Sequence, residues 1–284
     1  MIEKLIVRLS FVSIAFGLGC SSAAIQPPTQ SYDVSAIRYG TLERFAASGL
    51  VAGADTSRRV DVALMIWLAR APGGRNVLMD AGFYREKFMA RWKPANYEKP
   101  SVAIARVGLT PQDITDIIIS HIHWDHADGA DLFPNARIWI QREEYDKYID
   151  STSGRARSGT IDSLDAAMLF RLAKAGRIHL VDGDSVEIIP GIRVFTGGKH
   201  TFASQFASVQ IAGGTVVLAS DNAYLYENLN GKRPIAQTLD SLSNLRAQER
   251  MKRLASSPSL VVPGHDAAVF QHFPEPGNGV ARIR

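Results

Sequence analysis

The 284-residue sequence contains a single cysteine, Cys20, and only seven histidines. One cysteine cannot form an internal disulfide, and Cys20 lies so close to the N-terminus that the mature chain is expected to offer no thiolate to a metal. Charged residues make up 21% of the chain and hydrophobic residues 46%, which argues against disorder and allows a packed core. The basic residues are not interleaved with stacking aromatics, so nucleic-acid binding is not expected.

The sequence also lacks an apolar run near its N-terminus that is long enough to span a bilayer, which takes about 20 residues. The apolar stretch Leu9–Gly19 is much shorter, and the basic residues Lys4 and Arg8 precede it. A short basic region followed by a short apolar region is typical of an export signal. We therefore expect an exported protein without a transmembrane helix.

The end of this signal resembles the processing site of bacterial lipoproteins, in which Cys20 would carry the lipid anchor. Gly17 stands where such sites usually carry leucine, and ordinary cleavage after Ala24 is the alternative. Either route predicts a periplasmic location in a bacterium, with or without attachment to the membrane.

Three segments are expected: a signal over residues 1–24, a polar tether over 25–34 and one folded domain over 35–284. Predicted strands and helices alternate through the domain, and no middle segment has the composition of a linker. Each half supplies a sheet and covering helices, which predicts an α/β domain of four layers. A long helix is predicted over 234–254, with Leu239, Leu242 and Leu245 on one face, and the final strand over 259–262.

One stretch concentrates the histidines that the rest of the chain lacks. The apolar run Ile117–Ile119 predicts a buried strand, and His121, His123, Asp125 and His126 follow it directly. Imidazole nitrogens and carboxylate oxygens are the ligands that Zn²⁺ and similar divalent ions take. Three of the seven histidines within six positions favour a metal site over a polar loop with chance histidines.

Three more candidate ligands, His200, Asp221 and His265, each follow another predicted strand. Strand ends that gather at one edge of a sheet are a rigid place to build a site. The sequence therefore predicts that all of these side chains meet at one edge of the fold.

The pattern Ser120-His-Ile-His-Trp-Asp-His126 with Gly129, His200, Asp221 and Pro263-Gly-His265 resembles the metallo-β-lactamase-fold hydrolases. Asp80-Ala81-Gly82 matches an early strand-end aspartate of that family, and the resemblance runs from about residue 35 to 273. It implies an αββα sandwich with two divalent metal ions at one edge, Zn²⁺ in the first instance, although the same ligands accept Mn, Fe or Co.

The resemblance also implies a role for each ligand. His121, His123 and His200 would hold the first metal; Asp125, His126 and His265 would hold the second; Asp221 would bridge the two. Asp80 would support the ligands without touching a metal.

The ligand set indicates which enzymes of this family the chain resembles. Zinc β-lactamases lack this bridging aspartate, and one of their main classes has a cysteine in its place, so Asp221 argues against β-lactam hydrolysis. Glyoxalase II and RNase Z-type nucleases share all the ligands. The nuclease reading is weaker because this chain has no obvious tRNA-binding insertion and carries an export signal.

The position of Tyr224 in the sequence favours a lactone as the small-molecule substrate. Asp221-Asn-Ala-Tyr224 resembles the quorum-quenching N-acyl-homoserine lactonases, in which a tyrosine three residues past the bridging aspartate reaches the substrate carbonyl. A packed core ring is the alternative for this tyrosine. The resemblance implies attack by a metal-bridging hydroxide, with Asp125 or Asp221 carrying the proton to the departing alkoxide.

The loop after the fifth ligand departs from the family. It reads Lys199-His-Thr-Phe-Ala-Ser-Gln205, whereas the usual segment is rich in glycine and proline and has a second histidine. A thioesterase, a glyoxalase II-like enzyme or another ester hydrolase therefore stays open, as does a non-catalytic metal-binding module. Phe83, Phe202 and Phe206 are candidates for an acyl-chain pocket, with core packing as the alternative.

Overall fold

A computed structural model describes residues 30–273 and 279–283 of the chain. The predicted export signal, Cys20 and the first half of the predicted tether lie outside these residues. No helix within the described part is long and apolar enough to cross a membrane.

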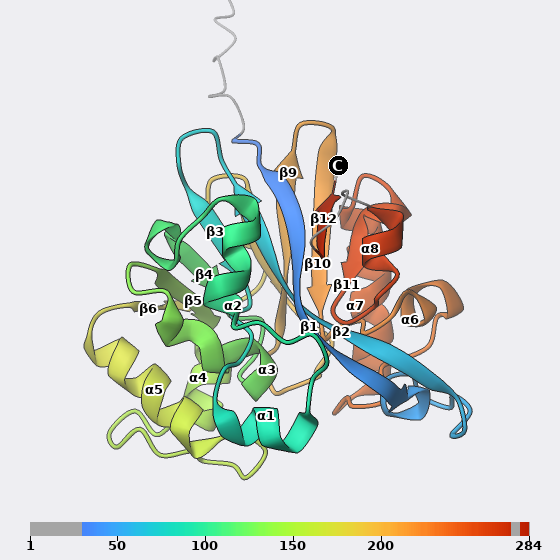
Figure 1. Cartoon of the computed structure of the whole chain (residues 1–284), viewed down its shortest axis with the longest axis horizontal. Helices are drawn as coiled ribbons and strands as arrows, with labels where there is room; N and C mark the ends of the chain where they lie inside the picture. The colour runs from blue at the N-terminus through green and yellow to red at the C-terminus, as the bar shows by residue number, and fades with distance from the viewer. Residues whose placement is uncertain (1–29, 274–278, 284) are drawn as a thin grey trace, which may run out of the picture.

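Strands of the described residues form one sheet of seven and one of five, which lie face to face (Figure 1). The larger sheet has the order β12 (Val280–Ile283), β1 (Asp33–Ala46), β2 (Arg59–Arg70), β3 (Asn76–Met79), β4 (Asp116–Ile118), β5 (Arg137–Gln141) and β6 (Ile178–Val181). The smaller has the order β11 (Val261–Pro263), β10 (Gly214–Ser220), β9 (Gln205–Ile211), β8 (Ile192–Thr196) and β7 (Val186–Ile189).

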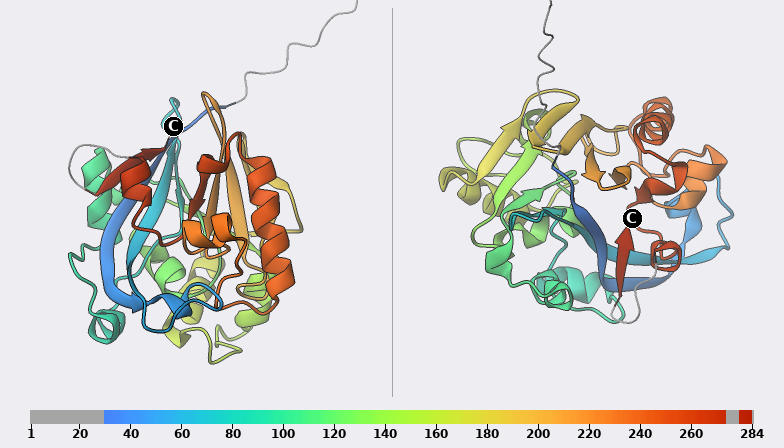
Figure 2. Two further views of the ribbon diagram at one scale, coloured as in Figure 1. Left: turned by 90° about the vertical axis from the view of Figure 1, so that its right-hand side faces the viewer. Right: turned by 90° about the horizontal axis from the view of Figure 1, so that it is seen from above.

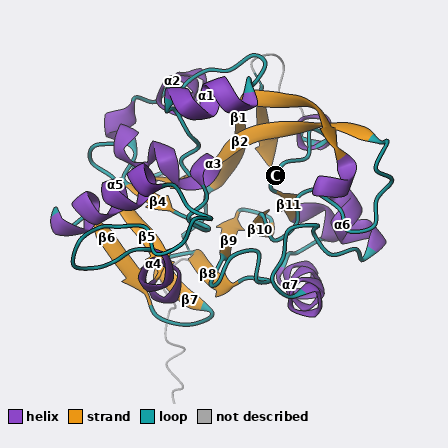
Figure 3. Cartoon of the chain, turned by 90° about the horizontal axis from the view of Figure 1, so that it is seen from below, coloured by secondary structure: helices purple, strands orange, loops and turns teal. Residues whose placement is uncertain are grey.

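Helices cover the outer faces of the two sheets, as the views from the side and from below show (Figures 2 and 3). In chain order they are α1 (Glu86–Trp92), α2 (Pro100–Ala103), α3 (Trp124–Ala127), α4 (Arg142–Tyr148), α5 (Ser163–Lys174), α6 (Tyr226–Gly231), α7 (Ser241–Leu254) and α8 (Val269–His272). Helices α1 to α5 lie with the larger sheet, and α7 packs on the smaller one (Figure 3).

The period-two alternation of the strands explains the four layers. In β2, Leu64 and Ile66 face the helices of the larger sheet, whereas Met65 and Trp67 face the other sheet. Likewise Val217 in β10 packs toward α7, while its neighbours face the space between the sheets. Alternate side chains of a strand point to opposite faces, so each sheet feeds two separate cores. The predicted αββα sandwich is confirmed.

Two sequence-based expectations are wrong. The helix predicted over 234–254 begins only at Ser241, because the Asp240 side chain accepts a hydrogen bond from the Ser243 amide and so caps the helix there. Its buried face carries Asn244, Ala247, Gln248 and Met251, whereas Leu239 and Leu242 are 69% and 67% exposed.

The strand predicted over 259–262 is also not the last one. β12 follows it and pairs antiparallel with β1 at the edge of the larger sheet. This strand has only four residues and its partner lies more than 200 positions away, so its local sequence carries little signal.

Candidate metal centre

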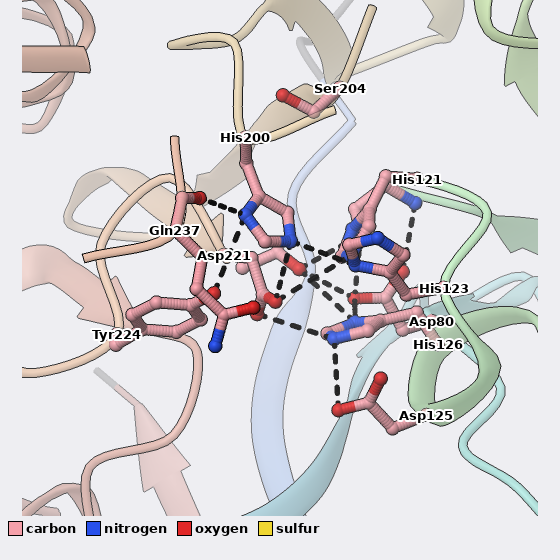
Figure 4. A network of polar contacts seen from close by, with 12 residues as sticks. Asp80, His121, His123, Asp125, His126, His200, Ser204, Asp221, Tyr224 and Gln237 are labelled. Atoms are coloured by element: carbon pink, nitrogen blue, oxygen red, sulfur yellow. Dashed lines mark hydrogen bonds and ion pairs between the residues drawn. The ribbon is translucent and has the colours of Figure 1, made fainter. Parts of the chain in front are cut away.

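The side chains predicted as ligands meet at one edge of the sandwich, where several strands end (Figure 4). The loop after β4 carries His121 and His123, and the short helix α3 carries Asp125 and His126. His200, Asp221 and His265 follow β8, β10 and β11. The structure divides these seven residues into two groups, His121, His123, His200 and Asp221 on one side and Asp125, His126 and His265 on the other, with the ligand atoms of each group within 4.8 Å of one another.

Asp221 lies between the two groups and turns one carboxylate oxygen to each (Figure 4). Its Oδ2 is 3.5 Å from His121 Nε2 and 3.2 Å from His200 Nε2. Its Oδ1 is 3.2 Å from His126 Nε2 and 3.0 Å from His265 Nε2. A carboxylate in this position can share its two oxygens between two cations.

Three imidazoles close the first group. His123 Nδ1 lies 3.0 Å from His121 Nε2 and 2.9 Å from His200 Nε2. In the second group, Asp125 Oδ2 lies 3.6 Å from His126 Nε2 and 3.8 Å from His265 Nε2. Each group therefore brings nitrogen and oxygen atoms to a common point, as the ligands of a divalent ion do.

Asp80 supports this centre from β3. Its Oδ2 lies 2.7 Å from His126 Nδ1 and accepts hydrogen bonds from the Ser120 and Ser220 hydroxyls. Its Oδ1 accepts the Ser120 amide at 2.8 Å. A carboxylate on the second nitrogen of a ligating histidine fixes the orientation of the ring and raises its basicity. The predicted supporting role of Asp80 agrees with these contacts.

Backbone carbonyls orient two other histidines. His200 Nδ1 lies 2.7 Å from the Gln237 carbonyl oxygen, and His265 Nδ1 lies 3.0 Å from the Ala63 carbonyl oxygen. In both rings the hydrogen bond at Nδ1 leaves Nε2 as the nitrogen that faces Asp221.

Gly129 lets the motif loop pack against the end of β3. A Cβ atom at this position would lie 2.2 Å from the Ala81 carbonyl oxygen, which is too close for any side chain. The Gly129 amide instead donates to the Gly82 carbonyl at 2.8 Å. Glycine is therefore required here by close backbone approach.

The protonation of the histidines differs between the two groups. Burial, reinforced by neighbouring histidines, holds the pKa of His121 well below its usual value and lowers the pKa of His123 to about 4. Burial acts in the same direction on His126, but Asp221, Asp125 and Asp80 outweigh it and hold the pKa of His126 well above its usual value. His126 and His265 in turn hold the pKa of Asp221 well below its usual value against the effect of burial. The carboxylates of the second group and Asp221 thus favour a positive charge beside them, carried by a protonated histidine or by a cation.

Two buried polar atoms at the centre, His126 Nε2 and Asp221 Oδ1, lie 3.2 Å apart, but neither has a partner with the geometry of a hydrogen bond. Buried polar atoms are usually satisfied, and an unsatisfied one calls for a missing water or ion. A cation between them would satisfy both. The donor set, the shared aspartate and these two atoms together fit a pair of divalent ions.

Tyr224 is also at the centre. Its hydroxyl lies 3.4 Å from His200 Nδ1, and its ring packs between His200 and His265. Burial, with Asp221 and Asp125 adding to it, holds the pKa of Tyr224 well above its usual value, so the phenol keeps its proton. All eight residues predicted for the site are therefore brought together.

A cavity of about 120 Å³ opens beside the ligands. Its polar side is formed by His123, Asp125, Asp221, Tyr224, Gln237 and His265, and its apolar side by Leu42, Phe45, Leu50, Val62, Trp92 and Trp124. Trp92 and Trp124 stack with ring centroids 5.4 Å apart and nearly parallel planes.

The phenylalanines that the sequence suggested for an acyl pocket do not line this cavity. Phe83 and Phe206 are fully buried in cores, and Phe202 lies on the surface against Lys147 and Lys199. The apolar wall comes instead from Trp124 within the motif and from residues of β1, β2, α1 and the segment after β1, which are far from the ligands in sequence, so the motif gave no signal for most of it.

Comparison with known proteins defines the family. The sequence model of the metallo-beta-lactamase superfamily matches residues 61–265, which include every ligand described above. The chain belongs to the metallo-β-lactamase superfamily. Its layers and its strand-end ligands are those that this membership implies.

Within the superfamily, the chain is similar to N-acyl homoserine lactonases. One from a Bacillus species is 31% identical over 165 residues, which cover 57% of this chain and 60% of the lactonase. The N-acyl homoserine lactonase AttM of Azorhizobium caulinodans is 25% identical over 188 residues, 64% of this chain and 70% of AttM. The match to the Bacillus protein thus spans less than two thirds of that protein.

Solved structures of metallo-β-lactamase-fold lactonases share the fold. An N-acyl homoserine lactone hydrolase with the product N-hexanoyl-L-homoserine at its catalytic metal center has a TM-score of 0.71 at 20% identity and covers 90% of this chain and 100% of its own. AidC, a dizinc quorum-quenching lactonase, has a TM-score of 0.62 at 15% identity and covers 90% of this chain and 97% of its own.

Proposed function

We propose that this chain is a metal-dependent hydrolase that opens the lactone ring of N-acyl-homoserine lactones. The observation that carries the proposal is the position of Tyr224, a buried, protonated phenol beside both ligand groups and at the edge of an apolar cavity. The similarity to N-acyl homoserine lactonases supports the same substrate class.

Two divalent ions held by these ligands would lower the pKa of a shared water to about 7 and so supply hydroxide at neutral pH. We propose Zn²⁺ for both, because histidine nitrogens dominate the ligand set; the same ligands also take Mn, Fe or Co.

The side chains then divide the remaining work. The Tyr224 hydroxyl donates a hydrogen bond to the lactone carbonyl oxygen, which becomes negatively charged as the carbonyl carbon is attacked. Asp125 and Asp221, whose carboxylates line the cavity, can accept a proton and pass it to the ring oxygen as the carbon–oxygen bond breaks. One water is added across the ester bond of the lactone, and the product is an N-acyl-homoserine.

The apolar wall of the cavity suits the acyl chain. Phe45, Trp92 and Trp124 form a row of rings that begins next to Asp125. A ligand pocket with an apolar wall and a few convergent polar groups fits a substrate with a polar head and an apolar tail.

A thioesterase or another ester hydrolase is the second candidate, because the loop after His200 differs from the usual lactonase loop although Thr201 and Gln205 match it. The same residues would act on a thioester carbonyl, with a thiolate as the leaving group. The leaving group is therefore what an assay must decide.

The test is hydrolysis by the purified protein of acyl-homoserine lactones, acyl thioesters and β-lactams, with metal content measured on the same sample. The proposal requires lactone opening to exceed thioester cleavage in kcat/KM. In the Tyr224→Phe variant we expect lactone turnover to fall about 10- to 100-fold, or roughly 1.4–2.7 kcal/mol of transition-state stabilisation, with normal metal content. Unchanged turnover in this variant would remove the main structural support for a lactone substrate.

We also propose that the chain is exported, on the basis of its N-terminal pattern. Cell fractionation and the mass of the mature N-terminus test this, and the Cys20→Ser variant separates lipid attachment from simple cleavage. Only a loss of membrane association in this variant supports the lipid anchor.

A further inference from the structure

Glu144 is a fully buried carboxylate outside the ligand set, and no role in the metal site follows from the family pattern described above. It lies in the first turn of α4, directly after β5, and its side chain points away from solvent. Its neighbour Glu143 is exposed. Burying a carboxylate is costly unless hydrogen bonds compensate, so the contacts of Glu144 indicate what the residue does.

Each oxygen of Glu144 holds a different ligand-bearing loop. Oε1 accepts the amide of Ile122 at 3.3 Å, and Ile122 stands between His121 and His123 in the loop after β4. Oε2 accepts the amide of Ala203 at 2.7 Å, and Ala203 lies three residues after His200 in the loop after β8. One carboxylate therefore ties together two loops that come from different sheets.

A second residue of α4 strengthens the same connection. The Tyr148 hydroxyl, one helical turn after Glu144, accepts the amide of Phe202 at 3.2 Å. Two consecutive amides of the loop after β8 are thus bound by one face of α4. On the opposite side of this loop, Asn222 Oδ1 accepts the Gly198 amide at 2.6 Å.

These loops are irregular, so their amides cannot be satisfied by a strand or helix. A buried amide that loses its acceptor destabilises the structure, and a small shift of the loop would relieve this. Such a shift would move His200 relative to His123, whose nitrogens are 2.9 Å apart. Ligand geometry of this kind must be kept within about 0.5 Å for tight binding.

We propose that Glu144 is a positioning residue for the first metal ion, setting the distance between the His121–His123 pair and His200. The second group has its own supports, Asp80 for His126 and the Ala63 carbonyl for His265, neither of which contacts Glu144. Within the loop after β8, the amides of Phe202 and Ala203 are therefore held by α4.

The experiment is a competitive zinc titration of the full chain that yields two dissociation constants, with His200→Ala and His265→Ala as references for the two sites. In Glu144→Gln, one oxygen is replaced by an amide group that faces a donor. We expect the first-site dissociation constant to rise about 10- to 100-fold while the second stays unchanged. Glu143→Gln, at the exposed neighbouring position, is the matched control and should change neither.

Two further variants keep the inference testable if Glu144→Gln does not fold. Glu144→Asp retains the charge but is one methylene shorter, so it should weaken the first site less than Glu144→Gln. Tyr148→Phe removes only the acceptor for the Phe202 amide and should weaken the first site about 2- to 10-fold.

The ratio of the two constants separates positioning from a general effect on folding. A thermal midpoint that falls while both sites weaken equally, or a ratio that stays constant in every folded variant, would overturn the inference. It rests on the two-metal site of the proposed function but not on the substrate. A wild-type protein that binds two zinc ions and opens no lactone would refute only the proposed lactonase activity, and one that binds no zinc would overturn both.

Discussion

The two groups of ligands that meet at Asp221 are held in different ways. In the first, a backbone carbonyl orients His200, and the loop that carries it is tied to α4 through its amides. In the second, the buried carboxylate of Asp80 contacts His126 directly and is itself held by two serine hydroxyls and an amide. The Glu144 carboxylate thus acts on the first group through backbone amides of its loops, whereas in the second group a carboxylate contacts the ligand His126 itself and only His265 is oriented by a backbone carbonyl.

The electrostatics follow the same division. Burial and neighbouring histidines lower the pKa of His121 and His123, so these rings are neutral and ready to bind a cation. Burial opposes protonation of His126 and His265 too, but nearby carboxylates outweigh it and raise their pKa. Binding of a cation to the second group must therefore displace protons, whereas binding to the first need not.

Removing a ligand from either group should give the largest effect. We expect His123→Ala in the first group and Asp125→Ala in the second each to lose metal from the altered group and all hydrolysis with it, because the proposed reaction needs an ion in both groups. Metal content by atomic emission and lactone turnover are measured on the same preparations. His179→Ala is the control, since His179 stacks on Trp139 outside the centre and its loss should leave two ions bound. Full turnover after complete chelation would contradict the two-metal mechanism.

Asp80→Asn should produce the next largest effect and should separate the groups. An amide cannot accept from Ser120, Ser220 and His126 together, so His126 loses its orienting carboxylate. We expect the second-site dissociation constant to rise about 10- to 100-fold, with a smaller change at the first site.

Zinc competition measures the dissociation constants of both sites in Asp80→Asn. The control is Asp113→Asn, at an exposed position in the short 3₁₀ helix Pro111–Asp113. Equal weakening of the two sites would mean that Asp80 supports the loop after β4 as a whole, through Ser120, and not His126 in particular.

The ligands themselves could be predicted because local sequence determines each of them. A β-branched run predicts a buried strand, and a polar residue directly after such a run lies at the edge of a sheet. This reasoning placed His121 after β4, Asp221 after β10 and His265 after β11. The resemblance to a known family then suggested which ligands share a metal, and the two groups in the structure agree with that division.

The remaining parts depend on contacts between distant segments. The apolar wall joins Phe45, Trp92 and Trp124 from three elements, and no local pattern brings them together. Glu144 could be predicted as an exposed helical residue from its position alone, yet it is buried because two loops from different sheets need its oxygens. Such residues become visible only once the sheets are packed.

A pH series should sharpen the comparison further. In the metal-free chain Asp221, Asp125 and Asp80 hold the pKa of His126 well above its usual value, so the second group carries a proton at neutral pH. The affinity of the second site should therefore rise with pH, by up to about tenfold per pH unit for each proton released. Burial holds the pKa of His121 well below its usual value and lowers the pKa of His123 to about 4, so these two rings should release no protons when the first site binds a cation between pH 6 and 8.

Zinc titrations at pH 6, 7 and 8, with proton release followed by an indicator dye, measure both effects. A first site that weakens on acidification as steeply as the second would show that the two groups do not differ in charge as described.

The smallest effect is expected at Gln237, which contacts the first group only through its backbone. Its carbonyl oxygen orients His200, while its side chain is exposed and donates to the Gly49 carbonyl at 3.3 Å. Gln237→Ala keeps the carbonyl, so the first-site dissociation constant should stay within about twofold of the wild-type value. The same zinc titration measures it, with Asp80→Asn in parallel. If Gln237→Ala weakened the first site as much as Asp80→Asn weakens the second, the Gln237 side chain and not its carbonyl would hold His200, and the contrast between a backbone contact to His200 and a carboxylate contact to His126 would be wrong.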